Sequence, residues 1–371
     1  MRSIALRLCA LTAIAATLFA GPAGATEDRP LPLESLAAAT RSVGVIPGLT
    51  AMAYRDGRFQ SAAVGQRRAS QPARIRLDDR LHVGSNLKSM TASVVAILVE
   101  RRRLRWEATL SELFPGLAMR PEYRTVTVEQ LLHHRGGVVS LRSIDEVAQA
   151  PAFDGTPVEQ RAAFAAWALS REPETPVGTF GYSNGGYALV GAIIERAAGI
   201  PYERAMQRHL FNPLRIDAVF GWPATFDRRA PWGHYDDAGS VVETDTADPQ
   251  FVFPAWLRAA GDASMNAADY ARYLAWHAEG RCGKTALLRR ASFERMHAVP
   301  ASEDGEPYSM GWSEIVAEDG RTVSVHSGSA GNFYTTAAID DRCERGIAIL
   351  ANSGSTAAGE AVEAAVLEWM R

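Results

Sequence analysis

Hydrophobic and polar positions follow two different periods along the chain, strand-like near both ends and helix-like between them. Apolar residues alternate over 47–64 on either side of an Asp56-Gly57 turn, which predicts a strand, a tight turn and a second strand. Near the C-terminus, apolar runs predict a helix over 356–370 and three strands over 322–326, 333–339 and 346–351. The sequence therefore places its sheet-forming segments at both ends.

The middle of the chain has the helical period instead. Leu87, Met90, Val94 and Ile97 recur at steps of three and four residues, so we expect a helix to begin near Ser85. The same period predicts helices over 127–134, 158–169, 186–198, 202–210 and 267–278. One sheet built from both ends of the chain, with a helical insert between them, is the economical arrangement.

Periodicity fails between Gly221 and Pro254. Proline, glycine and aromatic residues are frequent there, and the aromatic ones are Trp222, Phe226, Trp232, Tyr235, Phe251 and Phe253. Such long loops in compact domains are usually functional or disordered, and the aromatic residues favour an ordered lid over the substrate.

The first residues have the pattern of a secretory signal peptide. Arg2 and Arg7 precede a short apolar run, and Ala23-Gly24-Ala25 follows as a cleavage site. The run is shorter than the roughly 20 residues that a bilayer span needs. We therefore expect residues 1–25 to be removed and the chain over 26–371 to be periplasmic or secreted. No stable membrane insertion is expected after cleavage.

Composition and charge narrow the functions open to the remaining chain. The sequence is 47% hydrophobic and 22% charged, as in ordinary globular proteins, and its net charge of −3 argues against nucleic-acid binding. Without a Cys/His cluster or a G-x-G-x-x-G segment between a strand and a helix, neither a metal nor an organic cofactor is expected. Cys282 and Cys343 remain after cleavage, and the sequence leaves open whether they pair.

Ser85-Asn86-Leu87-Lys88 is the first candidate for catalytic chemistry. Ser85 and Lys88 are three residues apart, so they lie on nearly the same face of the expected helix. Only Lys88 and Lys284 are lysines among the 39 basic residues, and lysine, unlike arginine, becomes a neutral base where its surroundings lower its pKa. The pair supplies a nucleophile and a potential base. By itself the pattern also fits an N-cap serine and a solvated lysine.

Two further short motifs would complete such a site. Tyr182-Ser183-Asn184 precedes the apolar helix; a phenol relays protons, and an amide holds a substrate carbonyl or the lysine amine. His326-Ser327-Gly328 ends an expected strand. Its glycine lets a ligand lie against the strand edge, and the following N–H donates to an oxyanion. Alone, each motif also fits a purely structural role.

In this order, S-x-x-K, Y-x-N and H-x-G resemble the motifs of the penicillin-recognising serine hydrolases. These include class C β-lactamases, D-alanyl-D-alanine carboxypeptidases and related esterases and D-aminopeptidases. The resemblance extends from Pro47 to Met370 and implies an α/β (α+β) fold of the β-lactamase/DD-peptidase type. Such a fold has an antiparallel sheet flanked by helices plus a mainly helical inserted domain. Here the α/β part would comprise 26–84 and 260–371, and the helical part 85–259.

The resemblance also implies a mechanism. Ser85 would attack an amide or ester carbonyl, and Lys88 and Tyr182 would move the proton. The backbone N–H groups of Ser85 and Ser329 would form the oxyanion hole. A small-molecule or peptide substrate would form an acyl-enzyme with Ser85, and water would then release the acyl group. Four further positions would bind the substrate: Asn184, His326, Ser327 and Gly328.

His326 departs from the class C β-lactamases, which resemble K-T-G in the third motif. A histidine is a weaker, titratable cation and would hold a substrate carboxylate less firmly at neutral pH. H-x-G is more similar to the carboxypeptidase, aminopeptidase and esterase branches. We therefore expect an activity of one of those types, with weak β-lactamase activity at most. The choice among a β-lactam, a D-alanyl peptide and an ester stays open, as does the oligomeric state.

Two alternatives compete with this interpretation. The segment 181–185, Gly-Tyr-Ser-Asn-Gly, fits G-x-S-x-G, the nucleophile elbow of α/β-hydrolases, with His326 downstream. That alternative needs a buried strand before Ser183, which 176–180 is poorly suited to form, and it leaves the S-x-x-K motif without a role. The second alternative is a penicillin-binding sensor that is acylated without turnover.

Overall fold

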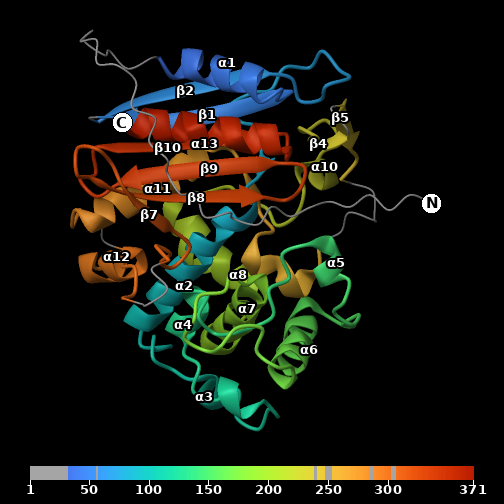
Figure 1. Ribbon diagram of the computed structural model, residues 1–371, viewed down its shortest axis with the longest axis vertical. Helices are drawn as coiled ribbons and strands as arrows, with labels where there is room; N and C mark the ends of the chain where they lie inside the picture. The colour runs from blue at the N-terminus through green and yellow to red at the C-terminus, as the bar shows by residue number, and fades with distance from the viewer. Residues whose placement is uncertain (1–31, 56, 238–239, 247–252, 285–286, 302–305) are drawn as a thin grey trace.

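The structure is a computed structural model that describes residues 32–371, apart from residues 56, 238–239, 247–252, 285–286 and 302–305. A six-stranded antiparallel sheet lies at one end of the molecule, and many of the helices gather beneath it as a second part (Figure 1). The strand order is β2-β1-β10-β9-β8-β7. The strands are β1 (Gly48–Arg55), β2 (Arg58–Gly65), β7 (Ser313–Val316), β8 (Thr322–Ser329), β9 (Tyr334–Asp340) and β10 (Arg345–Ala351).

The sheet combines strands from both ends of the chain, as the hydrophobic pattern predicted. β1 pairs with β10, with Leu49 opposite Ala351, and with β2 through the tight turn at Gly57, whose φ is 74°. β8 pairs with β9 on one side and with β7 on the other. β7 was not predicted, because its four residues are half-buried or exposed and carry little apolar pattern.

One face of the sheet is covered by α1 (Leu33–Val43) and α13 (Thr356–Met370). Both helices run roughly along the strands in Figure 1. Alternate strand positions such as Ile349 pack against Leu36 of α1 and Val362 of α13 in one apolar cluster. α1 was not predicted from the sequence, because this short helix has no side-chain cap at its N-terminus.

The opposite face packs on α11 (Ala267–Arg281), and the helical part lies beyond it. The centre of that part is α2 (Leu87–Glu100), which is buried from Leu87 to Leu98. The helix expected over 202–210 is divided into α8 and a π-helical turn at Gln207–Phe211. The remaining helices are α3 (Leu110–Leu113), α4 (Val128–Leu132), α5 (Ile144–Val147), α6 (Pro157–Ser170), α7 (Asn184–Ala198), α8 (Tyr202–Met206), α9 (Asn212–Leu214), α10 (Pro223–Phe226) and α12 (Arg290–His297).

The segment expected to form a lid contains a hairpin that the sequence analysis missed. β4 (Gly233–Asp237) pairs with β5 (Ser240–Thr244). The backbone N–H of His234 donates to the carbonyl of Asn332 over 2.9 Å, which attaches β4 to the segment between β8 and β9. Residues 247–252 of the expected lid lie outside the described part, so the lid function stays a prediction.

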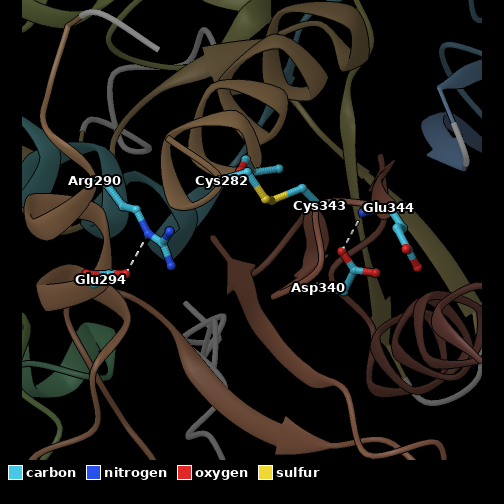
Figure 2. Close-up of a disulfide and its surroundings, with 7 residues drawn as sticks. Cys282, Arg290, Glu294, Asp340, Cys343 and Glu344 are labelled. Atoms are coloured by element: carbon cyan, nitrogen blue, oxygen red, sulfur yellow. Dashed lines mark hydrogen bonds and ion pairs between the residues drawn. A yellow bond between two sulfur atoms is a disulfide. The ribbon is translucent and has the colours of Figure 1, made fainter. Parts of the chain in front are cut away.

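Cys282 and Cys343, whose pairing the sequence left open, form a disulfide (Figure 2). Cys282 directly follows α11, and Cys343 lies in the turn between β9 and β10. Their Cα atoms are 6.6 Å apart. In the same turn the Glu344 N–H donates to the Asp340 carboxylate over 2.9 Å. The disulfide therefore joins the sheet to the helix packed against it.

The signal peptide expected over residues 1–25 lies outside the described residues. In the part that the structure describes, no helix combines the length and the apolar character that crossing a bilayer requires. No three His, Cys, Asp or Glu side chains of that part are grouped as metal ligands.

Candidate active site

The S-x-x-K motif begins the central helix. Gly84–Asn86 form a 3-10 turn, η1, that leads directly into α2. Nζ of Lys88 lies 3.0 Å from Oγ of Ser85, so the two side chains meet as their spacing predicted. Ser85 is half-buried and Lys88 is completely buried. The hydroxyl is therefore the accessible member of the pair.

Burial sets the charge of Lys88. Desolvation lowers its pKa well below the usual value, because the ammonium form would lose its hydration inside the protein. Its surroundings are aromatic: the ring centroids of Tyr182 and Tyr187 lie 4.9 and 5.5 Å from Nζ. The amine is therefore available in its neutral form, as general-base chemistry requires.

Two carbonyl acceptors fix the direction of the bond between Ser85 and Lys88. Nζ donates to Oδ1 of Asn184 over 2.7 Å and to the backbone carbonyl of Ala260 over 2.6 Å. A neutral amine has two N–H groups and one lone pair, so the lone pair is left for the Ser85 hydroxyl. The amide of Asn184 is held in turn, because its Nδ2 donates to the Leu141 carbonyl over 2.8 Å. Of the two roles expected for Asn184, the structure shows contact with the lysine amine.

Tyr182 is hydrogen-bonded to Ser85. Desolvation raises the pKa of this phenol, and the hydrogen bond to Ser85 and the charge of Arg142 offset only part of the rise. Tyr182 is thus protonated at neutral pH and suited to donating a proton. The ring of His134 packs on it at 4.2 Å between centroids and accepts the backbone N–H of Ser183 over 3.0 Å. His134 therefore holds the segment that carries the phenol.

The end of β8 lies against the start of α2. A Cβ on Gly328 would come within 2.8 Å of the Ser85 amide nitrogen, and a Cβ on Gly84 within 2.7 Å of the Ser329 amide nitrogen. Only glycine permits this approach, and Gly84 also has a left-handed φ of 53°. Among the described strands, β7 pairs with β8 only as far as Val325. The rest of that edge is not paired with another described strand, and it lies beside two N–H groups that suit an oxyanion.

His326 ends a chain of buried phenols. Its Nε2 lies 3.2 Å from the Tyr308 hydroxyl, Tyr308 is hydrogen-bonded to Tyr187, and Tyr187 donates to the Leu132 carbonyl over 2.9 Å. Because that carbonyl only accepts, each phenol proton points away from His326, and Nε2 is left to donate. Burial is the main cause that lowers the pKa of His326 to about 3. The imidazole is therefore neutral at pH 7. The expectation that His326 holds a substrate carboxylate only weakly stays a prediction.

Ser327 points to the other face of the sheet. Successive residues of a strand face opposite sides. The Ser327 hydroxyl lies 2.7 Å from the Glu363 carboxylate of α13 and 3.0 Å from the Thr336 hydroxyl. The Ser327 hydroxyl therefore faces away from the site, and the expected binding of substrate at this position, which is left to its backbone, stays a prediction.

Ser183 has a structural role. Its Oγ accepts the N–H of Gly186 over 2.8 Å as the N-cap of α7 and donates to the Val139 carbonyl over 2.7 Å. The residue is 3% exposed, and in the described part of the chain no strand leads into it. An α/β-hydrolase elbow needs such a strand and an accessible serine. The alternative with Ser183 as nucleophile is therefore wrong.

Several residues that build the site were not predicted from the sequence. Ala260 contributes only a carbonyl, which no motif marks. Tyr308 lies just before Gly311, where a Cβ would come within 2.4 Å of the Ser89 amide nitrogen, so this segment is pressed against α2. A glycine in such a segment is a usable signal for close packing. His134 and the buried tyrosines carried no signal that separates them from core residues.

Comparison with known proteins places this site in a family. The family described as Beta-lactamase matches residues 33–368. Penicillin-binding protein 4 of Amycolatopsis lactamdurans is 25% identical over 331 residues, covering 85% of this chain and 83% of that protein. Protein flp of Staphylococcus aureus strain MW2 is 22% identical over 329 residues, and the match covers 86% of this chain but only 62% of flp.

Solved structures share the fold. The crystal structure of SurE has a TM-score of 0.74 and 26% identity, covering 91% of this chain and 75% of that chain. A structure of SurE with D-Leu has a TM-score of 0.71 at the same identity, covering 90% and 73%. A β-lactamase/D-alanine carboxypeptidase from Pseudomonas syringae has a TM-score of 0.71 at 18% identity, covering 91% and 99%. The fold expected from the motifs is confirmed.

Proposed function

The chain belongs to the beta-lactamase family as a serine hydrolase of the β-lactamase/DD-peptidase type, and from this premise we propose that it is an exported enzyme whose Ser85 is acylated by a small amide or ester. The observation that carries the proposal is the set of contacts at Lys88 Nζ. Two of them, to Asn184 and Ala260, use the N–H groups of a neutral amine. In the third contact, the lone pair of the amine points at the Ser85 hydroxyl.

The proposed reaction proceeds in two halves. Ser85 Oγ attacks the substrate carbonyl carbon while its proton moves to Lys88, and the N–H groups of Ser85 and Ser329 stabilise the oxyanion. The C–N or C–O bond then breaks, Tyr182 gives its proton to the leaving group, and the proton on Lys88 restores the phenol. Water repeats the attack on the ester of Ser85 and releases the acid. This division of labour follows from the lowered pKa of Lys88 and the raised pKa of Tyr182.

The neutral His326 favours substrates that carry no carboxylate beside the scissile bond. A lysine at this position of the third motif would offer a charge to such a group, whereas the imidazole with a pKa of about 3 offers none at neutral pH. We therefore propose a D-amino-acid amide, a related short peptide or an ester as substrate, with β-lactams turned over weakly. The D-Leu bound to the relative SurE supports the D-amino-acid choice.

Two features support export. The pattern of residues 1–25 is that of a cleaved signal peptide. The disulfide between Cys282 and Cys343 is of a kind that persists in oxidising compartments. N-terminal sequencing of the protein recovered from the periplasm or medium tests this part. A mature N-terminus at Thr26 is expected, and a full-length cytoplasmic chain would refute it.

A labelling experiment tests the nucleophile. A fluorophosphonate probe and a fluorescent penicillin are expected to modify Ser85, and Ser85→Ala should abolish labelling. Ser183→Ala is the matched control, because that hydroxyl is buried as a helix cap; its variant should still be labelled. Lys88→Arg introduces a permanent cation and cannot supply a neutral amine, so labelling should slow by about 10²–10⁴-fold. Modification of another serine would contradict the proposal.

A turnover panel tests the substrate class. The purified chain without residues 1–25 would be given a p-nitrophenyl ester, a D-alanine amide, a D-alanyl-D-alanine peptide and a chromogenic cephalosporin. We expect turnover of the amide or ester to exceed that of the two substrates that bear a carboxylate. Preference for the carboxylate substrates would refute the role given to neutral His326. Labelling without turnover of any substrate would favour the penicillin-binding sensor.

A further inference from the structure

Two segments far apart in the sequence meet beneath Ser85. β3 (Leu81–His82) pairs with β6 (Ser264–Met265), and the Val83 N–H donates to the Ala263 carbonyl over 2.9 Å. The first segment continues into the nucleophile. The second begins at the carbonyl that holds the amine of Lys88. The distance between nucleophile and base therefore depends on how these two segments are held together.

A pair of buried side chains joins the same segments. The Gly84 N–H donates to Nδ1 of His82 over 3.2 Å, and Nε2 of His82 lies 3.3 Å from a carboxylate oxygen of Asp262. Because Nδ1 accepts, Nε2 carries the proton and donates to Asp262. The second oxygen of Asp262 accepts from Nε of Arg258 over 2.8 Å. A continuous series of hydrogen bonds therefore runs from Arg258 to the residue before the nucleophile.

The pair is closed to solvent and the proposed chemistry does not use it. His82 is 0% exposed and Asp262 is 1% exposed. The indole of Trp222 stacks on the imidazole at 4.3 Å between centroids, which fixes the ring plane. A buried aspartate and histidine are costly unless all their hydrogen bonds are satisfied.

We propose that His82 and Asp262 are positioning residues that hold Ser85 within reach of Lys88. Gly84 directly precedes the nucleophile, and Asp262 lies two residues after Ala260, whose carbonyl accepts from the amine over 2.6 Å. The His82–Asp262 hydrogen bond therefore ties the backbone of the nucleophile to the backbone of the lysine acceptor. Its loss lets the two segments separate and lengthens the 3.0 Å contact between hydroxyl and amine. The inference rests on the proposed acylation of Ser85.

Three variants separate positioning from folding. Asp262→Ala removes the acceptor, whereas Asp262→Asn keeps an oxygen for Nε2 of His82 while losing the charge that pairs with Arg258. His82→Phe keeps an aromatic ring against Trp222 but removes both hydrogen bonds. Asp340→Ala is the control: Asp340 is also a buried partner of an arginine, but it lies near the far end of β9 from the site.

The readouts are the rate of Ser85 labelling by a fluorophosphonate probe, kcat and KM for an ester or amide that the native enzyme turns over, and Tm. Asp262→Ala and His82→Phe are expected to lower the labelling rate and kcat on the order of 10- to 100-fold with KM unchanged. Asp262→Asn should recover most of that loss although its Tm falls as far as that of Asp262→Ala. Asp340→Ala should lower Tm but not kcat.

Two results would overturn the inference. The first is native-like labelling and kcat in folded Asp262→Ala and His82→Phe. The second is an equal loss of kcat in Asp262→Asn and Asp262→Ala, which would mean that charge or stability matters instead of the hydrogen bond. Failure of the proposed function is distinguishable, because in that case the native chain itself would not be labelled at Ser85.

Discussion

Gly328 of β8 approaches the start of α2 so closely that a Cβ on it would come within 2.8 Å of the Ser85 amide nitrogen. This contact brings the open edge of a strand to the N-terminus of the helix that carries the nucleophile. Backbone N–H groups from both elements meet there. For stabilising an oxyanion, the placement of these two backbone segments therefore matters as much as the side chains of the site.

The first prediction concerns this contact. Gly328→Ala should push β8 away from α2 and displace the oxyanion donors, so kcat/KM should fall by about 10²–10³-fold. Steady-state kinetics with an ester or amide substrate measures the loss. Gly320→Ala is the control, because Gly320 is exposed, has a left-handed φ of 78° and has no neighbouring atom within 4 Å of an added Cβ. It should cost stability and leave kcat/KM unchanged. Equal activity in both variants would contradict the prediction.

The second prediction concerns the charge beside Lys88. Asn184→Asp places a carboxylate where an amide oxygen lies 2.7 Å from Nζ, and a negative charge there favours the ammonium form. The pKa of Lys88 should rise, so the acidic limb of kcat/KM should move to higher pH by about 1–3 units. A pH profile measures the shift. Asn184→Ala removes the acceptor without adding charge and should lower the rate without raising the limb. An unshifted limb in Asn184→Asp would argue against Lys88 as the base.

The third prediction concerns acid stability. Burial lowers the pKa of His277 from 6.5 to about 3, and its imidazole bridges Ser93 and His297. Between pH 6.5 and about 3, His277 binds a proton in the unfolded chain but not in the folded chain. The contribution of neutral His277 to stability is therefore full above pH 6.5 and is lost as the pH falls toward 3. The free energy of unfolding should fall on acidification, and His277→Gln should flatten the dependence. Urea titrations at neutral and acidic pH measure both. If the free energy of unfolding depended on pH equally in the native protein and in His277→Gln, the prediction would be wrong.

The fourth prediction concerns the disulfide. Replacing both Cys282 and Cys343 by serine should lower the free energy of unfolding by about 2–4 kcal/mol, because the unfolded chain gains freedom. The bond lies beyond Asp340 at one end of β9, whereas the residue paired with Ser329 is at the other end, so kcat should be unchanged. Reductant should destabilise the native protein and leave the double variant unaffected. A loss of kcat in the folded variant would show that the turn is coupled to the site.

The sequence predicted those features that depend on neighbours along the chain. The period around Leu87 and Met90 predicted α2, and a spacing of one helical turn predicted the contact of Ser85 with Lys88. Alternation and the Asp56-Gly57 turn predicted the pairing of β1 with β2. In each case one local rule decides the geometry.

Other features required contacts between distant residues. Ser327 belongs to the third motif of the site, but strand alternation alone does not say which face of the sheet carries the site. In the structure the Ser327 hydroxyl is hydrogen-bonded to the Glu363 carboxylate. Ala260 ends a 3-10 helix over 255–260, and Asp262 lies two residues beyond it. Both contact the segment of the nucleophile 172 or more residues away, which no local pattern encodes. The hairpin of β4 and β5 is likewise attached through Asn332.

The pairing of β1 with β10 has a consequence for how the protein is made. A ribosome completes Ser85 and Lys88 early, yet β8, which lies beside them, and β10, which joins β1 to the rest of the sheet, are among the last residues to emerge. Such long-range pairing cannot begin until nearly the whole polypeptide is available. A stop codon shortly before β10 would therefore leave β1 and β2 without the strand that joins them to β9 and the rest of the sheet.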